Sequence, residues 1–462
     1  MPSIIEDMES NVRGYCRLFP TTFKTALGSR LVDVHDREFI DFFCGAGSLN
    51  YGHNNPLANA AILKYIEAGG IQHSLDATTE AKVRFLETFR ETILKPRQLN
   101  YRVQFTGPTG TNAVEAAIKL ARRATNRSHV IAFTHAYHGH TLGSLALTAN
   151  EAFHHQADGA RLNVSHLPFD GYFGDLDTAS FLEKMLTDSS SGIPVPAAII
   201  VETVQGEGGV NVADDTWLRR VADLCRRLEC LLIVDDIQVG NGRTGRFFSF
   251  EHAGITPDLV CLSKSLGGGL PLSIVLIKDE HDVWQPGQHT GTFRGNNLAF
   301  VAAEALLHYW SNPQFETDIQ TRSSIIADRL KQIAATASNP ISIRGRGLIW
   351  GLDMGSGTLA RRVIDAAFDY GLMMESSGAD DEVLKIMPAL TIPLLDLEAG
   401  LDIVQDCIEQ VEQTQQRGND RHRDVESEIA NWSANHSQAN IESQGQESVS
   451  PMVPASLNQG AS

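Results

Sequence analysis

The sequence predicts an α/β fold in which helices cover both faces of a mostly parallel sheet. Three observations support this prediction. Short apolar runs rich in β-branched residues alternate with helical patterns through the middle of the chain. The runs are apolar almost throughout, which is typical of strands buried on both faces. Glycine-rich or polar segments follow several of the runs, at the sheet edge where such folds bind ligands.

Six runs are the predicted strands, and two segments between them are the predicted helices. The strands are expected at Val103–Phe105, Val130–Phe133, Ala197–Val201, Leu231–Val234, Leu259–Leu262 and Ser273–Ile277. The spacing of apolar residues predicts helices over Val114–Ala124 and Asp214–Leu228. Asp214 or Asp215 is expected to cap the second helix at its N-terminus.

The composition limits the partners that we expect. The chain has 462 residues, 42% of them hydrophobic, and a net charge of −18, which opposes binding to nucleic acid or to an anionic membrane. The six cysteines are scattered, with no CxxC pair, which favours a reducing compartment. The N-terminus lacks the pattern of a secretory signal, and no apolar run has the length of a membrane span. We therefore expect a cytoplasmic protein.

The segment Thr106–Asn112, TGPTGTN, lies between a predicted strand and a predicted helix. Glycines let the backbone approach a ligand closely, and the N–H groups and dipole of a helix N-terminus favour a phosphate. Thr109 and Thr111 add hydroxyl groups, and Gly110 lies between them. The alternative is a tight turn with a threonine cap. The segment is not a Walker loop, because GK[ST] is missing.

Asp235 and Asp236 come directly after a predicted strand. A carboxylate in this position can bind a metal, cap a helix or pair with a cationic ring nitrogen. We expect no metal, because a metal site needs further ligands and Gln238 is a poor one. Pairing with a protonated pyridine nitrogen is what a pyridoxal-phosphate (PLP) site requires.

Lys264 stands at the end of an apolar strand and before three glycines, in LSKSLGGG. Lysines are rarely buried without a reason, and a Schiff base with PLP supplies one. The alternative is an exposed lysine in a loop. Tyr137 can stack on a planar cofactor, whereas a histidine such as His138 is more often structural. Thr292, in GQHTGTFRGNN, offers a further hydroxyl to a phosphate.

In order and spacing, these motifs resemble those of the class III (ω-amino acid) aminotransferases of PLP fold type I. The resemblance covers roughly residues 20 to 415, and its most specific stretches are DDIQVGNGRTG from Asp235 and VETVQGEGG from Val201. It implies a large PLP-binding domain and a smaller α+β domain built from the two chain ends. We expect an N-terminal segment over 1–60, the large domain over 61–330, the small domain over 331–418 and a disordered polar tail over 419–462.

The resemblance also implies roles for individual residues. Lys264 would form the Schiff base and shuttle a proton, and Asp235 would pair with the pyridine nitrogen. Gln238 would lie near the phenolic oxygen of the cofactor, and Tyr137 would stack on its ring. The phosphate would be held by Gly110 and Thr111 with Thr292 of a partner subunit, so a homodimer or higher oligomer is expected. The remaining residues implied at the cofactor are Thr109, His138 and Glu202.

Within the class, phrases such as GPTGTN resemble the diaminobutyrate–2-oxoglutarate aminotransferases of ectoine and siderophore pathways. Glu207 is similar to a gating glutamate that masks a substrate-binding cation. The class usually has an arginine as that cation, but VLKIMPAL places Lys385 there. The implied reaction forms L-2,4-diaminobutyrate and 2-oxoglutarate from L-glutamate and L-aspartate 4-semialdehyde. The alternatives are another ω-aminotransferase, of the ornithine, 4-aminobutyrate or β-alanine type, and a catalytically silent paralogue.

Overall fold

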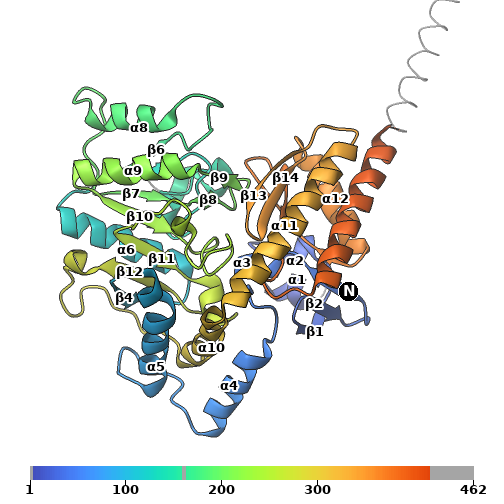
Figure 1. The fold of residues 1–462 in the computed structure, drawn as a ribbon, viewed down its shortest axis with the longest axis horizontal. Helices are drawn as coiled ribbons and strands as arrows, with labels where there is room; N and C mark the ends of the chain where they lie inside the picture. Colours follow the sequence, from blue (N-terminus) through green and yellow to red (C-terminus); the bar gives the residue numbers. More distant parts are fainter. Residues whose placement is uncertain (1–3, 159–162, 417–462) are drawn as a thin grey trace, which may run out of the picture. The chain divides into compact units, whose positions relative to one another are not determined.

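The structure is a computed structural model that describes residues 4–158 and 163–416. The chain divides into two compact units, Met1–Ile408 and Glu409–Ser462. The architecture below is that of the first unit (Figure 1). Of the second unit only residues 409–416 are described, and they are helical. The tail predicted over 419–462 therefore lies outside the described residues.

The central feature is a seven-stranded sheet with the strand order β4-β12-β11-β10-β7-β5-β6. Only β12 runs antiparallel to its neighbours, so the predicted α/β class with a mostly parallel sheet is confirmed. The connection between β11 and β12, residues 263–273, is too short for the crossover helix that a parallel return requires. The strands are β4 Tyr101–Phe105, β5 Val130–Phe133, β6 Val164–Leu167, β7 Ala198–Val201, β10 Leu231–Asp235, β11 Leu259–Leu262 and β12 Ile274–Lys278.

Both faces of this sheet are covered, as the apolar runs predict. Alternate residues of β10 point to opposite sides: Ile233 packs in the core beneath α6 (Gly110–Thr125), and Val234 in the core beneath α9 (Asp215–Leu228). Figure 1 shows both helices against the sheet. Asp214 caps α9 as expected, because its side chain accepts from the backbone N–H of Thr216 at 2.7 Å.

One strand of the seven-stranded sheet, β6, was not predicted from the sequence. Its residues Val164–Leu167 are only partly buried except for the last, because β6 is an edge strand of the sheet. The sequence VSHL therefore lacks the continuous apolar character of the inner strands.

Besides the large sheet, the described residues form two four-stranded sheets and a two-stranded one, β8-β9. The first has the order β13-β14-β17-β16 and is antiparallel; the second has the order β1-β2-β3-β15. In the second, β15 pairs in parallel with β3, with Leu372 opposite Ile40, so the two ends of the chain join in one sheet. The strands are β1 Phe23–Leu27, β2 Arg30–Asp33, β3 Glu38–Asp41, β13 Ser342–Arg346, β14 Ile349–Asp353, β15 Leu372–Met373, β16 Glu375–Ser377 and β17 Val383–Ile386.

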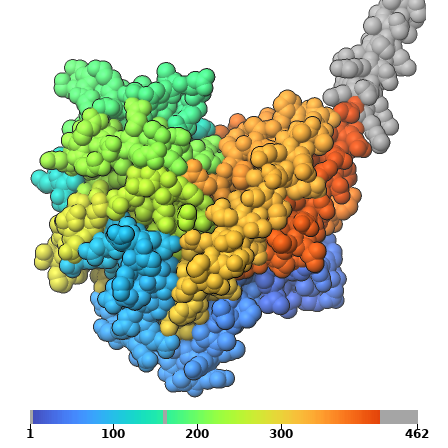
Figure 2. Space-filling model, in the orientation of Figure 1, coloured from blue at the N-terminus to red at the C-terminus, as the bar shows by residue number. Residues whose placement is uncertain are grey.

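The remaining helices cover these sheets and each other. In the space-filling view, segments far apart in the sequence meet on one face, such as α4 and α10, which are in contact (Figure 2). No helix of the described residues is long and apolar enough to cross a membrane. The predicted domain boundaries stay a prediction. The other elements are α1 Ile4–Met8, α2 Tyr15–Leu18, α3 Cys44–Gly47, α4 Pro56–Glu67, α5 Glu80–Phe89, α7 Leu142–Leu145, α8 Thr178–Thr187, β8 Val204–Gln205, β9 Asn211–Val212, α10 Asn297–Leu307, α11 Pro313–Thr336, α12 Gly357–Asp369 and a helix over residues 394–408.

Candidate active site

A cavity of about 320 Å³ lies at the carboxyl ends of β10 and β11, where ligands of parallel sheets bind. All the site residues predicted from the sequence line it, except Thr292 and Lys385. Its lining consists of Thr109, Gly110, Thr111, Tyr137, His138, Gly139, His140, Glu202, Glu207, Asp235, Ile237, Gln238, Val239 and Lys264.

Lys264 follows β11 and begins a short 3₁₀ turn, Lys264–Gly267. Its φ of +47° lies in the left-handed region, which is strained for any residue with a side chain and is often kept at functional sites. Lys264 Nζ donates a hydrogen bond to the carbonyl oxygen of Ala46 at 2.7 Å. Burial lowers the pKa of the Lys264 amine, so a larger fraction of it is neutral and able to attack a carbonyl carbon.

Asp235 and His138 form a buried pair at the floor of the cavity. His138 Nδ1 lies 2.7 Å from Asp235 Oδ2, and the side chain of His138 is fully buried. Burial lowers the pKa of His138, but the hydrogen bond and charge of Asp235 outweigh it and raise the pKa overall. The carboxylate of Asp235 is therefore fixed by its neighbour and faces the cavity.

Asp236 points elsewhere. One of its oxygens accepts from the backbone N–H of Ser249 at 3.0 Å, and the other accepts from the Ser249 hydroxyl. Asp236 does not line the cavity, so the structure distinguishes the two adjacent aspartates that the sequence presents together. Burial raises the pKa of Asp236 to about 7.

The N-terminus of α6 forms another wall of the cavity. Thr109 is the N-cap, and its N–H and hydroxyl both donate to Asn112 Oδ1, at 3.2 and 2.9 Å. A Cβ atom on Gly110 would lie 2.9 Å from Ile237 Cγ2, so only glycine fits there without a shift of Ile237. Thr111 Oγ1 lies 2.8 Å from Ser144 Oγ. The helix terminus presents free N–H groups and the positive end of its dipole, which suit a phosphate.

Tyr137 and Glu202 are held together at the side of the cavity. The backbone N–H of Tyr137 donates to Glu202 Oε1 at 3.0 Å, and the ring of Tyr137 packs against His140 and Phe153. Burial raises the pKa of Glu202 to about 8, although His138 opposes this shift. Glu202 therefore supports the segment that carries Tyr137.

A cluster of polar side chains closes the opposite side. Gln238 Nε2 donates to Glu207 Oε1 at 2.8 Å and to the carbonyl of Ala46 at 3.1 Å. Lys385, on β17, is fully buried, and its Nζ lies 2.9 Å from Glu207 Oε1 and 2.9 Å from Glu375 Oε1. Burial lowers the pKa of Lys385, but the two carboxylates outweigh it and raise the pKa overall. Lys385 therefore stays charged, with two anionic partners.

Glu375 and Ala46 were missed from the sequence. Glu375 is a single acid after the apolar run Leu372–Met374, and a lone acid next to such a buried run indicates a paired charge. Ala46 contributes only its carbonyl oxygen, which no side-chain pattern reveals. The glycines of FFCGAGSLNYG are the one local sign of unusual backbone there.

Thr292 does not line the cavity. Its carbonyl oxygen accepts from His73 Nε2 at 3.0 Å, in the loop that precedes α10. The role predicted for Thr292 needs a partner subunit and stays a prediction.

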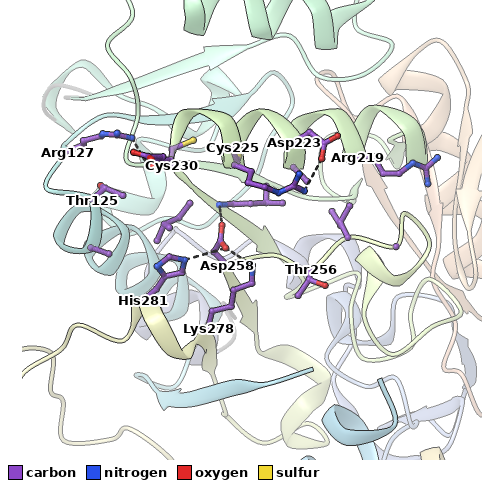
Figure 3. A pocket seen from close by; sticks show the side chains of 18 residues that line it. Thr125, Arg127, Arg219, Asp223, Cys225, Cys230, Thr256, Asp258, Lys278 and His281 are labelled. Carbon is purple, nitrogen blue, oxygen red and sulfur yellow. Dashed lines mark hydrogen bonds and ion pairs between the residues drawn. The ribbon is translucent and has the colours of Figure 1, made fainter. Parts of the chain in front are cut away.

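A second cavity, of about 830 Å³, lies at the opposite edge of the sheet, near the start of β10 and β11 (Figure 3). Several of its charged groups already have partners: Lys278 Nζ lies 2.7 Å from Asp258 Oδ1, and Arg127 donates to backbone carbonyls. None of the predicted site residues lines it. The candidate active site is therefore the first cavity.

The residues of the first cavity fit PLP. A partly buried lysine, a buried carboxylate and a helix N-terminus surround it, and these match the aldehyde, the ring nitrogen and the phosphate of that cofactor. Gln238 Oε1 and His138 Nε2 are buried with no hydrogen-bond partner among the described residues. Within the same residues, no group of three or more His, Cys, Asp or Glu side chains is arranged to hold a metal ion.

The fold and this site define a class of enzymes that transfer amino groups. A family model described as aminotransferase class-III matches residues 13–408, and the chain belongs to that family. A relative from Bordetella parapertussis, named diaminobutyrate–2-oxoglutarate transaminase, is 55% identical over 407 residues, covering 87% of this chain and 94% of the relative. A relative of the same name from Halomonas elongata is 54% identical over 414 residues, covering 88% of this chain and 98% of the relative.

A solved structure shares the fold. The ornithine aminotransferase from Toxoplasma gondii, described with partial occupancy of PLP at its active site, superimposes with a TM-score of 0.75. It is 25% identical, and the match covers 88% of this chain and 93% of that chain. The expected PLP fold type I is confirmed.

Proposed function

We propose that this enzyme is a PLP-dependent aminotransferase that converts L-glutamate and L-aspartate 4-semialdehyde into 2-oxoglutarate and L-2,4-diaminobutyrate. The observation that carries the chemistry is one cavity that holds both the Lys264 amine and the Asp235 carboxylate. The choice of substrates rests on the relatives named above, which match this chain over nearly their whole length. A catalytically silent paralogue would not need the strained Lys264 in this position.

Each residue of the cavity would have a separate role in binding the cofactor or in moving a proton. PLP, when bound, supplies a carbonyl carbon that captures amines and a ring that accepts electrons. Asp235 would hold the proton at the ring nitrogen, and the α6 N-terminus would hold the phosphate. Lys264 Nζ would anchor the cofactor and, once released, move a proton to or from the reacting carbon of the substrate. Tyr137 would pack on the ring and exclude water from one side.

Two different substrates must be accepted in turn. Glutamate has a carboxylate on its reacting carbon, whereas aspartate semialdehyde has only hydrogen there. Lys385 would bind that carboxylate when Glu207 moves aside, and Glu207 would mask Lys385 when the semialdehyde is bound. Their 2.9 Å contact is the masked arrangement. Lysine offers a point charge rather than the two-pronged contact of arginine, so the carboxylate would be held by one charged group.

We further infer that the enzyme works in the cytoplasm as a homodimer in which Thr292 reaches the phosphate at the partner's cofactor. No disulfide joins the six cysteines, which all lie within the described residues and are free thiols. Five of the thiols are buried, which is compatible with a reducing compartment.

A panel of amino donors tests the reaction. Purified enzyme is given 2-oxoglutarate with diaminobutyrate, ornithine, 4-aminobutyrate or β-alanine under one assay, and kcat/KM is measured for each. We expect diaminobutyrate to exceed the others by at least about 10-fold, since a misplaced charge or methylene costs about 1–3 kcal/mol.

Lys264→Ala is the control for this panel. It should lose the visible absorbance that borohydride abolishes in the wild type, and it should lose turnover by several orders of magnitude. A wild-type enzyme that prefers ornithine, or that ignores diaminobutyrate, would refute the proposed substrate.

A further inference from the structure

Glu375 is a buried carboxylate that the reaction described above does not use. It lies on β16, directly opposite Lys385 of β17 in the antiparallel register, so that the two side chains form a cross-strand pair. Only 4% of the surface of its side chain is exposed to solvent, and its Oε1 lies 2.9 Å from Lys385 Nζ. Lys385 therefore has a fixed carboxylate partner on the neighbouring strand in addition to Glu207.

The two carboxylates have different environments. Burial raises the pKa of Glu207, but Lys385 and Lys264 outweigh it and lower the pKa to about 2. Burial raises the pKa of Glu375 to about 7, with Lys385 acting in the opposite direction. The ammonium of Lys385 is thus balanced by Glu207, and Glu375 is the excess carboxylate of the cluster.

This cluster borders a second space next to the cofactor cavity. Glu375 and Glu207 both line a cavity of about 900 Å³, and Glu207 also lines the cofactor cavity. The other charged residues of the larger cavity balance in sign: two arginines, Arg361 and Arg362, and two aspartates, Asp380 and Asp381. The unbalanced negative charge of this larger cavity therefore comes from Glu375.

The groups that face Glu375 come from four parts of the chain. Lys385 belongs to β17, Glu207 to the turn between β8 and β9, Lys264 to the turn after β11 and Tyr15 to α2. Tyr15 stays neutral over the ordinary pH range, because burial raises the pKa of its hydroxyl. When Lys264 is engaged with the cofactor, no second cation among these groups offsets Glu375.

We propose that Glu375 is a specificity-determining residue: together with Glu207 and Lys385 it gives the substrate wall one more carboxylate than ammonium, and this wall favours substrates that carry a second ammonium group. Diaminobutyrate carries one more ammonium than carboxylate, whereas glutamate carries one more carboxylate than ammonium. A fixed negative charge in a site of low dielectric attracts the first and repels the second. The proposal rests on the proposed function, because it names the group by which that site would recognise diaminobutyrate.

Glu375→Gln tests this proposal, because it keeps the shape of the side chain and removes the charge. KM and kcat are measured for the glutamate and diaminobutyrate half-reactions by single-turnover and steady-state kinetics. We expect KM for diaminobutyrate to rise about 3- to 10-fold and KM for glutamate to fall by about the same factor, with little change in kcat. A residue with only a structural role would shift both KM values in the same direction.

Two further variants serve as controls. Asp380→Asn removes a carboxylate from the wall of the same cavity, but Asp380 is exposed and does not touch Lys385, so we expect changes below about 2-fold because of screening. Glu375→Asp keeps the charge and should keep the wild-type preference between the two substrates. If Glu375→Gln fails to fold, the pH dependence of the wild type still tests the charge, because it changes the charge of Glu375 without a substitution.

The pH dependence gives an independent readout. Glu375 ionises near pH 7, so the preference of the wild type for diaminobutyrate over glutamate should grow between about pH 6 and 8. In Glu375→Gln, the preference for diaminobutyrate over glutamate should not increase with pH. The substrates ionise in the same way for both enzymes, so a difference between the two pH profiles comes from the enzyme. KM values that move together, or an unchanged pH profile, would overturn the role of Glu375. A wild type without diaminobutyrate activity would instead overturn the proposed reaction.

Discussion

At the residue scale, the site depends on groups whose charge is fixed by burial and by one or two charged neighbours. Lys385 stays charged because two carboxylates touch it, and His138 is held by Asp235. Lys264 has a lowered pKa because burial disfavours its charged form. These opposite shifts are the arrangement that acid–base work at neutral pH requires.

The two adjacent aspartates provide a prediction at this scale. Asp235→Asn removes the charge that would hold the protonated ring nitrogen, and the loss of such a buried pair costs about 3 kcal/mol or more, which is about 100-fold in kcat. Asp236→Asn should cost less than about 10-fold, because Asp236 contacts Ser249 and not the cavity. Measured kcat values in the reverse order would show that the wrong aspartate was assigned.

The sequence predicted most of these residues for a physical reason. A lysine before a glycine run or a carboxylate after a buried strand breaks a local pattern, which makes Lys264 and Asp235 candidates; their order and spacing along the chain, together with the family resemblance, assigned their roles. The sequence does not show that the side chains of Asp235 and Asp236 point in different directions. Both residues lie at the end of one strand and differ only in the face of the sheet to which they point. Glu375 was missed because its partner Lys385 becomes its neighbour only through strand pairing.

At the element scale, the part of the site that suits a phosphate depends on the residues at the N-terminus of α6. Thr109 caps the helix, and Gly110 lets it approach Ile237. The inner strands and both central helices were predictable because each buries a continuous or periodic apolar face. The edge strand β6 was not, because an edge strand buries less and so carries a weaker pattern.

Gly110→Ala tests the close approach. The added methyl group would lie 2.9 Å from Ile237 Cγ2 and push the two walls of the cavity apart. We expect the dissociation constant for PLP, measured by titrating apoenzyme, to rise about 10-fold or more, since overpacking costs about 1–3 kcal/mol. Adding Ile237→Ala should restore part of the affinity, with Ile237→Ala alone as the reference. If the double variant binds as weakly as Gly110→Ala, steric contact with Ile237 is not the cause.

At the scale of the whole molecule, the small sheets matter because they bring distant segments to the cavity. β17 carries Lys385 and β16 carries Glu375, while α3, from the N-terminal part, carries the carbonyl of Ala46. The resemblance implied a smaller part built from both chain ends, and the pairing of β3 with β15 agrees with it. Local patterns alone do not predict this pairing, because its partners are far apart in the sequence.

The proposed homodimer can be tested by mixing two impaired variants at a PLP concentration too low to saturate Thr292→Val. Lys264→Ala abolishes the site of its own subunit, and Thr292→Val should raise the dissociation constant for PLP about 10-fold. If Thr292 serves the partner's cofactor, a heterodimer of the two variants contains one site with both native groups and recovers up to half of the wild-type turnover. If activity does not recover, Thr292 acts within its own chain or not at the phosphate.

The pairing of β3 with β15 also has a consequence for synthesis on the ribosome. Residues 38–41 emerge early and can pair with β2, but they cannot pair with β15 until Leu372 and Met373 have been made. The seven-stranded sheet is complete once β12 has emerged, so the pocket for the cofactor can assemble while the wall that holds Lys385 is still missing. A nascent chain would therefore acquire its chemistry before its selectivity, and discrimination between amino donors would be the last property to mature.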